Sequence, residues 1–340
     1  MSLSAFPQES GSLVKKHLSR EIYKALEHKQ TCSGFTLAKA INSGVKNPDS
    51  AIGIYAGDAQ SYDTFSQLFD PVISEYHGFS KGKKHKSDIT KLDLPSLDPE
   101  GKFIRSTRIR VARNLNGFCF PCHISLPRRK ELENKIITAL SFLKKDLKGN
   151  YFSFEQMDKK KIQQLEKKNL IFKKGDRFQD AAGINSDFPG CRGVFCSFNK
   201  KFMVWVNEED HLRIISLEKT SDISSVYNRL CRALMSLNRG LEFARDETYG
   251  YLTSCPTNIG TSMRAGVHIQ LEKLEQEKDL LGNLCLEYNL QIRGTLGEKT
   301  KIKNAVFDIS NRQRLGVTEH GIISNLYQGL MAIIKAEKNL

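Results

Sequence analysis

Apolar residues near the start of the chain recur at helical spacing. Leu18, Ile22 and Leu26 lie four residues apart and therefore share one helix face. A second apolar stretch, at 36–41, ends in an Asn-Ser-Gly triplet, where we expect the helix to stop. The following segment, 50–58, is rich in small residues and is predicted to be a loop. The first part of the chain is predicted to be helical.

Further along, short apolar runs predict strands and longer periodic runs predict helices. Strands and helices do not alternate strictly, so we expect an α+β fold with an antiparallel β-sheet flanked by helices, rather than a doubly wound sheet. The predicted strands lie at 202–206, 212–217, 267–271, 290–293 and 305–309, and the predicted helices at 132–147 and 322–333.

A lysine-rich and then proline-punctuated stretch separates the two parts and is typical of a linker. We therefore expect a small all-helical domain at 1–80, a linker at 81–101 and a larger α+β domain at 102–340. No internal repeat is evident.

Composition indicates a globular protein that can bury a sizeable core, because 340 residues are 39% hydrophobic. We find no run of about 18 apolar residues and no secretory signal pattern, so we expect a cytoplasmic protein that does not cross a membrane. The cysteines are scattered and are expected to be reduced thiols. Cys119, Cys122 and His123 lack a fourth zinc ligand at motif spacing.

Lysine and arginine outnumber aspartate and glutamate by 52 to 38, which gives a net charge of +14. This surplus favours polyanionic partners in general. The lysine runs at 81–86, 159–161, 167–168 and 173–174 lack interleaved aromatic residues, so nucleic acid is an improbable partner and solvent exposure is the simpler interpretation.

The stretch 255–261 carries the most informative chemistry. It places the Cys255 thiol, two threonines, Gly260 and the nearby Arg264 next to a predicted strand. A buried cysteine in a tight turn would also explain the Cys-Pro pair. The mixture nevertheless suits an anionic ligand, and Arg108 and Arg110, two residues apart in an extended segment, could address the same anion.

Two carboxylates complete the candidate chemistry. Glu209 lies in an acidic connection between two apolar strands, and Glu298 follows a glycine. Turns commonly contain acidic residues. Two carboxylates can also grip a planar guanidinium through paired hydrogen bonds and hold it in reactive geometry.

These residues together resemble the phosphagen (ATP:guanido) kinase family, most closely its arginine-specific members. The resemblance covers nearly the whole chain in the correct order, through the segments 53–56, 106–110, 205–215, 255–261, 264–269 and 308–311. It implies reversible, direct transfer of the γ-phosphoryl group of MgATP to a guanidino nitrogen, with Mg²⁺ held by nucleotide phosphates and water rather than by a protein metal site. It also implies a fold with a small helical domain and a larger glutamine-synthetase-like domain.

The resemblance assigns roles residue by residue. Glu209 and Glu298 match the carboxylates that align the guanidinium, and Cys255 matches the thiolate beside them. A lowered cysteine pKa is expected there, among arginines and next to a bound cation. The loop from Ser50 matches the loop that closes over the acceptor, with Gly53 and Tyr55 in it. The positions that match the nucleotide site are Ser106, Arg108, Arg110, Arg213, Arg264, His268, Arg293 and Asp308.

Several positions depart from the family pattern. Ala51 replaces a usual glycine, and Cys196 replaces a histidine common near the adenine. The expected closing loop has Leu296, Lys299 and, in place of two glycines, Asn304 and Ala305, which should stiffen it. L-arginine is the leading acceptor, with taurocyamine, lombricine or glycocyamine as alternatives. A catalytically weak relative that binds nucleotide or polyanions remains a different class of interpretation. The sequence leaves the oligomeric state unknown, with a monomer favoured.

Overall fold

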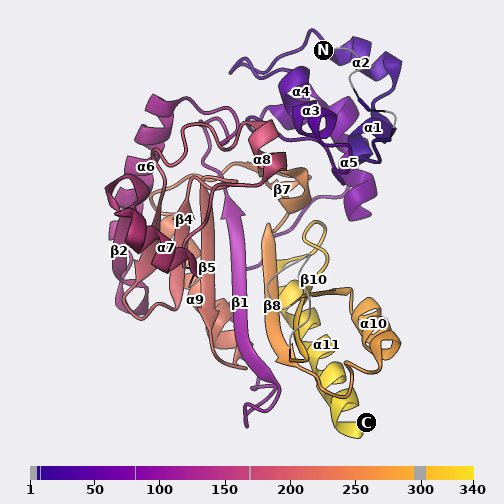
Figure 1. Cartoon of the computed structure of the whole chain (residues 1–340), viewed down its shortest axis with the longest axis vertical. Coiled ribbons are helices and arrows are strands. Elements are labelled where there is room, and N and C mark those ends of the chain that lie inside the picture. Colours follow the sequence, from indigo (N-terminus) through magenta and orange to yellow (C-terminus); the bar gives the residue numbers. More distant parts are fainter. Residues whose placement is uncertain (1–5, 8, 81, 168–169, 295–303) are drawn as a thin grey trace.

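The computed structural model describes residues 6–7, 9–80, 82–167, 170–294 and 304–340 (Figure 1). Five short helices form the N-terminal part, which lies beside one end of the large sheet. The helices are α1 (Leu13–His17), α2 (Arg20–Leu26), α3 (Leu37–Lys46), α4 (Ser61–Thr64) and α5 (Ser66–His77). Side chains of Ser12, Ser19 and Thr36 accept backbone N–H groups at the starts of α1, α2 and α3 and so fix where these helices begin.

Helix α3 continues past the Asn-Ser-Gly triplet, so the predicted stop was wrong. Gly44 lies inside the helix, and a glycine is required there because the loop that follows packs closely against it. The N–H of Gly44 donates to the carbonyl of Gly53 at 3.1 Å, and a Cβ on Gly44 would lie 2.6 Å from that oxygen. The glycine therefore permits close backbone approach and does not end the helix.

The larger part is built on one antiparallel eight-stranded sheet with the order β2-β3-β4-β5-β1-β8-β10-β9, which confirms the predicted fold class. Its strands are β1 (Ile104–Arg113), β2 (Gly149–Ser153), β3 (Gly193–Ser197), β4 (Phe202–Val206), β5 (Leu212–Glu218), β8 (Met263–Gln270), β9 (Leu290–Arg293) and β10 (Val306–Asn311). Strands β6 (Arg245–Asp246) and β7 (Gly250–Tyr251) form a separate pair.

Helices supply the rest of the large core. Ile109 and Val111 of β1 are buried with Leu230 of α9 and Leu326 of α11 in one apolar cluster. Burying these side chains on one face of β1 leaves its alternate residues, Arg108 and Arg110, on the other face. The helices of this part are α6 (Leu126–Ser141), α7 (Lys159–Lys167), α8 (Arg177–Ala182), α9 (Ile223–Leu237), α10 (Lys278–Glu287) and α11 (Glu319–Asn339).

A second apolar cluster joins the two parts of the molecule. Small-domain side chains such as Phe65 and Phe69 are buried together with Leu252, Cys255 and Leu315 of the larger part. The small helices therefore pack directly on the segment that carries the cysteine motif. In the described part of the chain, no helix combines the length and apolar character that crossing a bilayer requires.

Candidate active site

Strand β1 presents alternate polar side chains on the face opposite the helices. Ser106 pairs in register with His268 of β8, and Arg110 pairs with Arg264. His268 in turn pairs with Asp308 of β10. Paired residues in adjacent strands share one face of the sheet. The structure thus brings together residues predicted from three separate stretches of sequence.

The same row continues to the edge of the sheet. Asp308 pairs in register with Arg293 of β9, so the row Ser106, His268, Asp308, Arg293 crosses four adjacent strands. Next to it, Gly266 lies opposite Arg108. A Cβ at Gly266 would approach the Cβ of Ser310 to 2.9 Å, so the glycine keeps this part of the face open.

Arginines from distant segments line one cavity. Its lining includes Arg110, Arg213 and Arg264, which the sequence predicted, together with Arg314, which no motif indicated, and Asn258 and Ser262. Burial, followed by repulsion from Arg213, lowers the pKa of Arg110, and burial lowers the pKa of Arg264 to about 10. Crowded guanidinium groups at one cavity suit a multiply charged anion such as a nucleotide polyphosphate.

Asp308 holds one of these arginines in place. Nη2 of Arg264 lies 2.5 Å from Oδ2 of Asp308, and its Nε donates to Oγ of Ser310 at 3.3 Å. Both partners lie on β10, so the guanidinium is oriented by the neighbouring strand. Trp205 provides an aromatic surface near two further guanidinium groups, with its ring centroid 5.8 Å from Cζ of Arg108 and 5.6 Å from Cζ of Arg213.

The acidic turn between β4 and β5 lies beside this cavity. Asn207 adopts a left-handed φ of 58°, which reverses the chain and places Glu208 and Glu209 near Arg213. Nη2 of Arg213 is 2.8 Å from Oε2 of Glu208 and 3.4 Å from Oε2 of Glu209. Burial and the adjacent Asp210 raise the pKa of Glu209. Arg213 therefore links the arginine cavity to two carboxylates that are 14% and 12% exposed.

Cys255 begins the short 3₁₀ turn η4 (Pro256–Asn258) and its thiol is buried. Its Sγ lies 3.1 Å from Oγ1 of Thr257. Burial and the nearby Glu209 raise the thiol pKa to about 12, although the contact with Thr257 acts in the opposite direction. The protein's own groups therefore favour the neutral thiol, and the lowering expected next to a bound cation stays a prediction.

Of the residues predicted to bind the acceptor, only some lie near Cys255 and Glu209 among the described residues. Burial raises the pKa of Tyr55, and the charges of Cys255 and Glu209 raise it further, so these three groups share one neighbourhood. Ser50 and Gly53 make their described backbone hydrogen bonds within the small domain, to Asn47 and Gly44. Glu298, like Leu296 and Lys299, lies outside the described residues.

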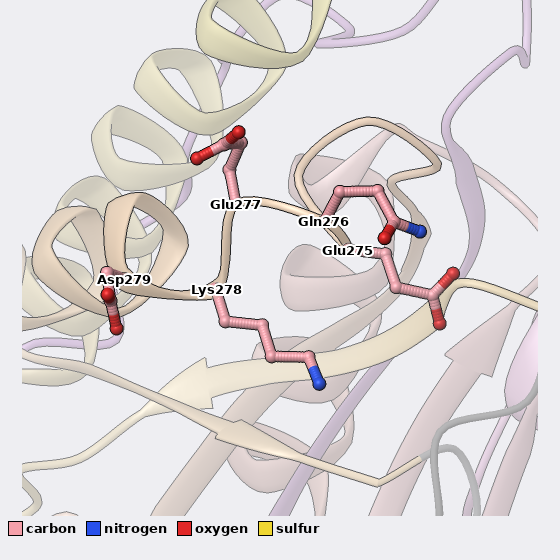
Figure 2. Close-up of a pocket in the computed structure, with 5 residues that line it drawn as sticks. All are labelled: Glu275, Gln276, Glu277, Lys278 and Asp279. Atoms are coloured by element: carbon pink, nitrogen blue, oxygen red, sulfur yellow. The ribbon is translucent and has the colours of Figure 1, made fainter.

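A larger hollow lies elsewhere, at the loop before α10 (Figure 2). It is lined by consecutive residues 275–279, and their side chains point in different directions rather than toward one centre. The groups that converge come from β1, β5, β8 and the 255–261 segment, so the arginine cavity is the candidate active site.

Family comparison agrees with this geometry. Residues 8–74 match the model for the N-terminal domain of ATP:guanido phosphotransferases, and residues 131–340 match the model for their C-terminal catalytic domain. The chain belongs to the ATP:guanido phosphotransferase family. As a phosphagen kinase, it is expected to use a polyphosphate site of the kind that the arginine cavity offers.

Among curated relatives, the chain is similar to arginine kinase of Limulus polyphemus, with 46% identity over 96% of this chain and 92% of that protein. It is 44% identical to arginine kinase of Plodia interpunctella over 98% of this chain and 94% of that protein. Arginine kinase of Anthopleura japonica is 44% identical over 99% of this chain, which spans only 48% of that longer relative.

Solved structures of the family share the fold. A lombricine kinase crystal structure superposes with a TM-score of 0.93 at 34% identity and covers 99% of this chain and 95% of its own. The duplicated taurocyamine kinase of Schistosoma mansoni, solved with transition-state analogue components, gives a TM-score of 0.91 at 35% identity. It covers 97% of this chain, which corresponds to 46% of that protein.

Proposed function

We propose that this chain catalyses the reversible reaction ATP + L-arginine = ADP + phosphoarginine and so buffers ATP. The observation that carries the proposal is the contact network of Arg213, which lines the arginine cavity and also approaches Glu209. The proposed anion site and the carboxylate proposed to bind the guanidinium are therefore neighbours. Similarity to three arginine kinases supports arginine as the acceptor.

In this proposal the arginines bind the nucleotide phosphates and neutralise charge that redistributes during transfer. The described residues contain no group of three or more His, Cys, Asp or Glu side chains suited to a metal ion. The cavity lining is cationic and amide-bearing and fits phosphate oxygens. On the strength of the family resemblance, Mg²⁺ would enter as part of the MgATP substrate. The set proposed for the nucleotide is Ser106, Arg108, Arg110, Arg213, Arg264, His268, Arg293 and Asp308.

On the acceptor side, Glu209 and Cys255 would hold the guanidinium, with Glu298 as a further carboxylate on the strength of the family resemblance. A guanidino nitrogen attacks the γ-phosphorus, an N–P bond forms, and the P–O bond to ADP breaks. The proton leaving the nitrogen passes to a carboxylate. Glu209 suits this task because burial and Asp210 raise its pKa.

Acceptor choice is proposed to depend on the loop that contains Ser50, Gly53 and Tyr55. Of these, Tyr55 shares the electrostatic neighbourhood of Cys255 and Glu209. The proposal assigns acceptor selection to a small domain at 1–80 and phosphoryl transfer to a domain at 102–340, with 81–101 as the linker.

A second candidate is transfer to another guanidino acceptor. The structural match to a lombricine kinase, with a TM-score of 0.93, favours keeping this alternative, as does Ala51 in the acceptor loop. The backbone alone does not distinguish acceptors, because family members with different acceptors share it.

The test is acceptor-dependent ADP release from MgATP, measured with L-arginine, taurocyamine, lombricine and glycocyamine. We expect L-arginine to give the highest kcat/KM, and Glu209→Gln or Cys255→Ala to reduce kcat at least about 100-fold. A higher kcat/KM with another compound would identify that compound as the acceptor in place of L-arginine. Nucleotide binding without any acceptor-dependent ADP release would reduce the protein to a nucleotide-binding relative.

A further inference from the structure

The backbone around Cys255 is held by side chains and backbone of the small domain. The hydroxyl of Tyr62 donates to the carbonyl of Thr253 at 2.8 Å, and the N–H of Ala56 donates to the carbonyl of Ser254 at 2.8 Å. On the other side of the cysteine, Nε2 of His77 lies 2.9 Å from the carbonyl of Pro256. The carbonyls on both sides of Cys255 thus contact the small domain.

His77 is the last residue of α5, and its burial determines its protonation state. Burial lowers its pKa to about 4, and the nearby Arg314 contributes in the same direction, so the ring is neutral at physiological pH. A carbonyl oxygen only accepts hydrogen bonds, so the contact with Pro256 requires the tautomer with the proton on Nε2. The ring of Tyr76 packs edge-on against it at 4.9 Å between centroids.

Arg314 holds the same turn from the side of the arginine cavity. Its Nη1 donates to the carbonyl of Thr257 and to Oδ1 of Asn258, both at 2.8 Å. Thr257 is also the residue whose hydroxyl contacts the Cys255 thiol. The turn 256–258 is therefore fixed between a small-domain histidine and an arginine of the anion cavity.

We propose that His77 is a positioning residue for Cys255, whose Nε2–H fixes the Pro256 carbonyl and thereby the direction of the thiol and of Thr257. This inference rests on the proposed role of Cys255 at the acceptor guanidinium. Because the histidine belongs to the small domain, this hydrogen bond couples the placement of that domain to the direction of the thiol, beside the bonds that Tyr62 and Ala56 make on the other side of Cys255.

The test uses the full chain with His77→Leu, which removes the donor, His77→Gln, whose amide nitrogen reaches the position of Nε2, and His77→Asn, whose amide is too short. Glu75→Gln is the matched control, since Glu75 lies on the same helix but contacts Lys16 and His17. Steady-state kinetics are measured together with the rate of Cys255 alkylation by iodoacetamide at pH 9, followed by mass spectrometry of the modified peptide.

We expect His77→Leu and His77→Asn to lower kcat about 10- to 100-fold, with the nucleotide KM changed less than about twofold, because misplacing a reactive group by about 1 Å costs that much. Alkylation should accelerate at least about fivefold as the turn loosens. His77→Gln should restore both values to within about threefold of the original protein, and Glu75→Gln should change neither.

Equal behaviour of the Gln and Asn variants would overturn the proposal, and this comparison stands even if the Leu variant fails to fold. The proposal would also be overturned if His77→Asn kept the kcat and the alkylation rate of the unsubstituted protein. Failure of the proposed function is a separate result, namely no acceptor-dependent ADP release from the original protein, and the alkylation contrast would still report whether His77 positions the thiol.

Discussion

Arg110 of β1 lies directly opposite Arg264 of β8 in the antiparallel register. Like charges in directly opposed sheet positions are destabilising. Arg213 and Arg314 line the same cavity, and together with Arg108 they add to the repulsion that, after burial, lowers the pKa of Arg110. We therefore expect this face of the sheet to be more favourable with a bound anion than without one.

Replacing Arg110 with methionine tests this relationship. Methionine keeps an apolar stem but removes one of the opposed charges, so we expect ADP affinity to fall about 10- to 100-fold. Stability without nucleotide should stay unchanged or rise by up to about 1 kcal/mol. Calorimetric titration with ADP and thermal unfolding measure the two effects.

Arg105→Met is the matched control. Arg105 lies on the same strand but contacts Gln270 and the carbonyl of Gly101 instead of the cavity. Its ADP affinity should match that of the original protein. A clear loss of stability without nucleotide in Arg110→Met would contradict the interpretation of opposed charges.

Two substitutions near Cys255 should change its thiol pKa in opposite directions. Glu209 raises its pKa and the hydrogen bond with Thr257 lowers it. Glu209→Gln should therefore lower the thiol pKa and speed alkylation at pH 9, where Glu209 is largely ionised, whereas Thr257→Ala should raise the pKa and slow alkylation. Changes of about three- to tenfold are expected from the rate of iodoacetamide modification at this cysteine. Changes in the same direction for both variants would contradict the assignment.

Ala305 adopts a left-handed backbone conformation, with φ of 54°. Alanine pays about 1–2 kcal/mol there, whereas glycine does not, although glycine loses more entropy on folding. We expect Ala305→Gly to stabilise the protein by about 0.5–1 kcal/mol in urea unfolding. Asn304, with φ of 53°, belongs to a residue type that tolerates this region, so Asn304→Gly should have a smaller effect. A larger gain at Asn304 than at Ala305 would refute the strain argument.

His211 should make the protein sensitive to acid. Its Nδ1 accepts from the N–H of Leu115 and its Nε2 contacts the carbonyl of Cys119, each at 2.9 Å. Burial lowers its pKa from 6.5 to about 3. The unfolded chain therefore takes up this proton first, and stability falls as pH decreases below about 6.5 until the folded pKa is reached.

At pH 5 this histidine alone should cost about 2 kcal/mol relative to pH 7.5. Urea unfolding at both pH values measures the difference. His211→Gln should be less stable overall but should show a smaller difference between the two pH values. His28, whose side chain is 91% exposed, provides the control, and His28→Asn should retain the full difference. An unchanged pH dependence in His211→Gln would refute the prediction.

Local pattern was sufficient for much of the fold. The predicted strand at 290–293 coincides with β9, and the predicted strand at 202–206 coincides with β4. Their apolar residues alternate or run continuously between turn residues, which is a local signal. The helix predicted at 132–147 was less accurate, because α6 ends at Ser141 and a separate 3₁₀ turn at Lys145–Leu147 supplies the last apolar residue.

The site was predicted in parts rather than as a whole. Arg108 and Arg110 could be assigned to one face because they lie two residues apart in a strand. Arg314 carries no local signal, and it reaches the cavity only because its guanidinium binds Thr257 and Asn258. The need for glycine at position 266 likewise could not be predicted from the sequence, because it arises from the close approach of Ser310 on the next strand.

The sequence by itself indicated the family and most of the proposed charged site groups through its motifs. It indicated the antiparallel α+β class through the order and periodicity of its apolar residues. Tertiary structure alone decided that Arg110 and Arg264 oppose each other and that the small domain contacts both sides of Cys255. It also decided that the protein's own groups raise the pKa of Cys255. Charge, burial and hydrogen bonding act across space, and residues far apart in the chain become neighbours only when the strands and the two domains pack.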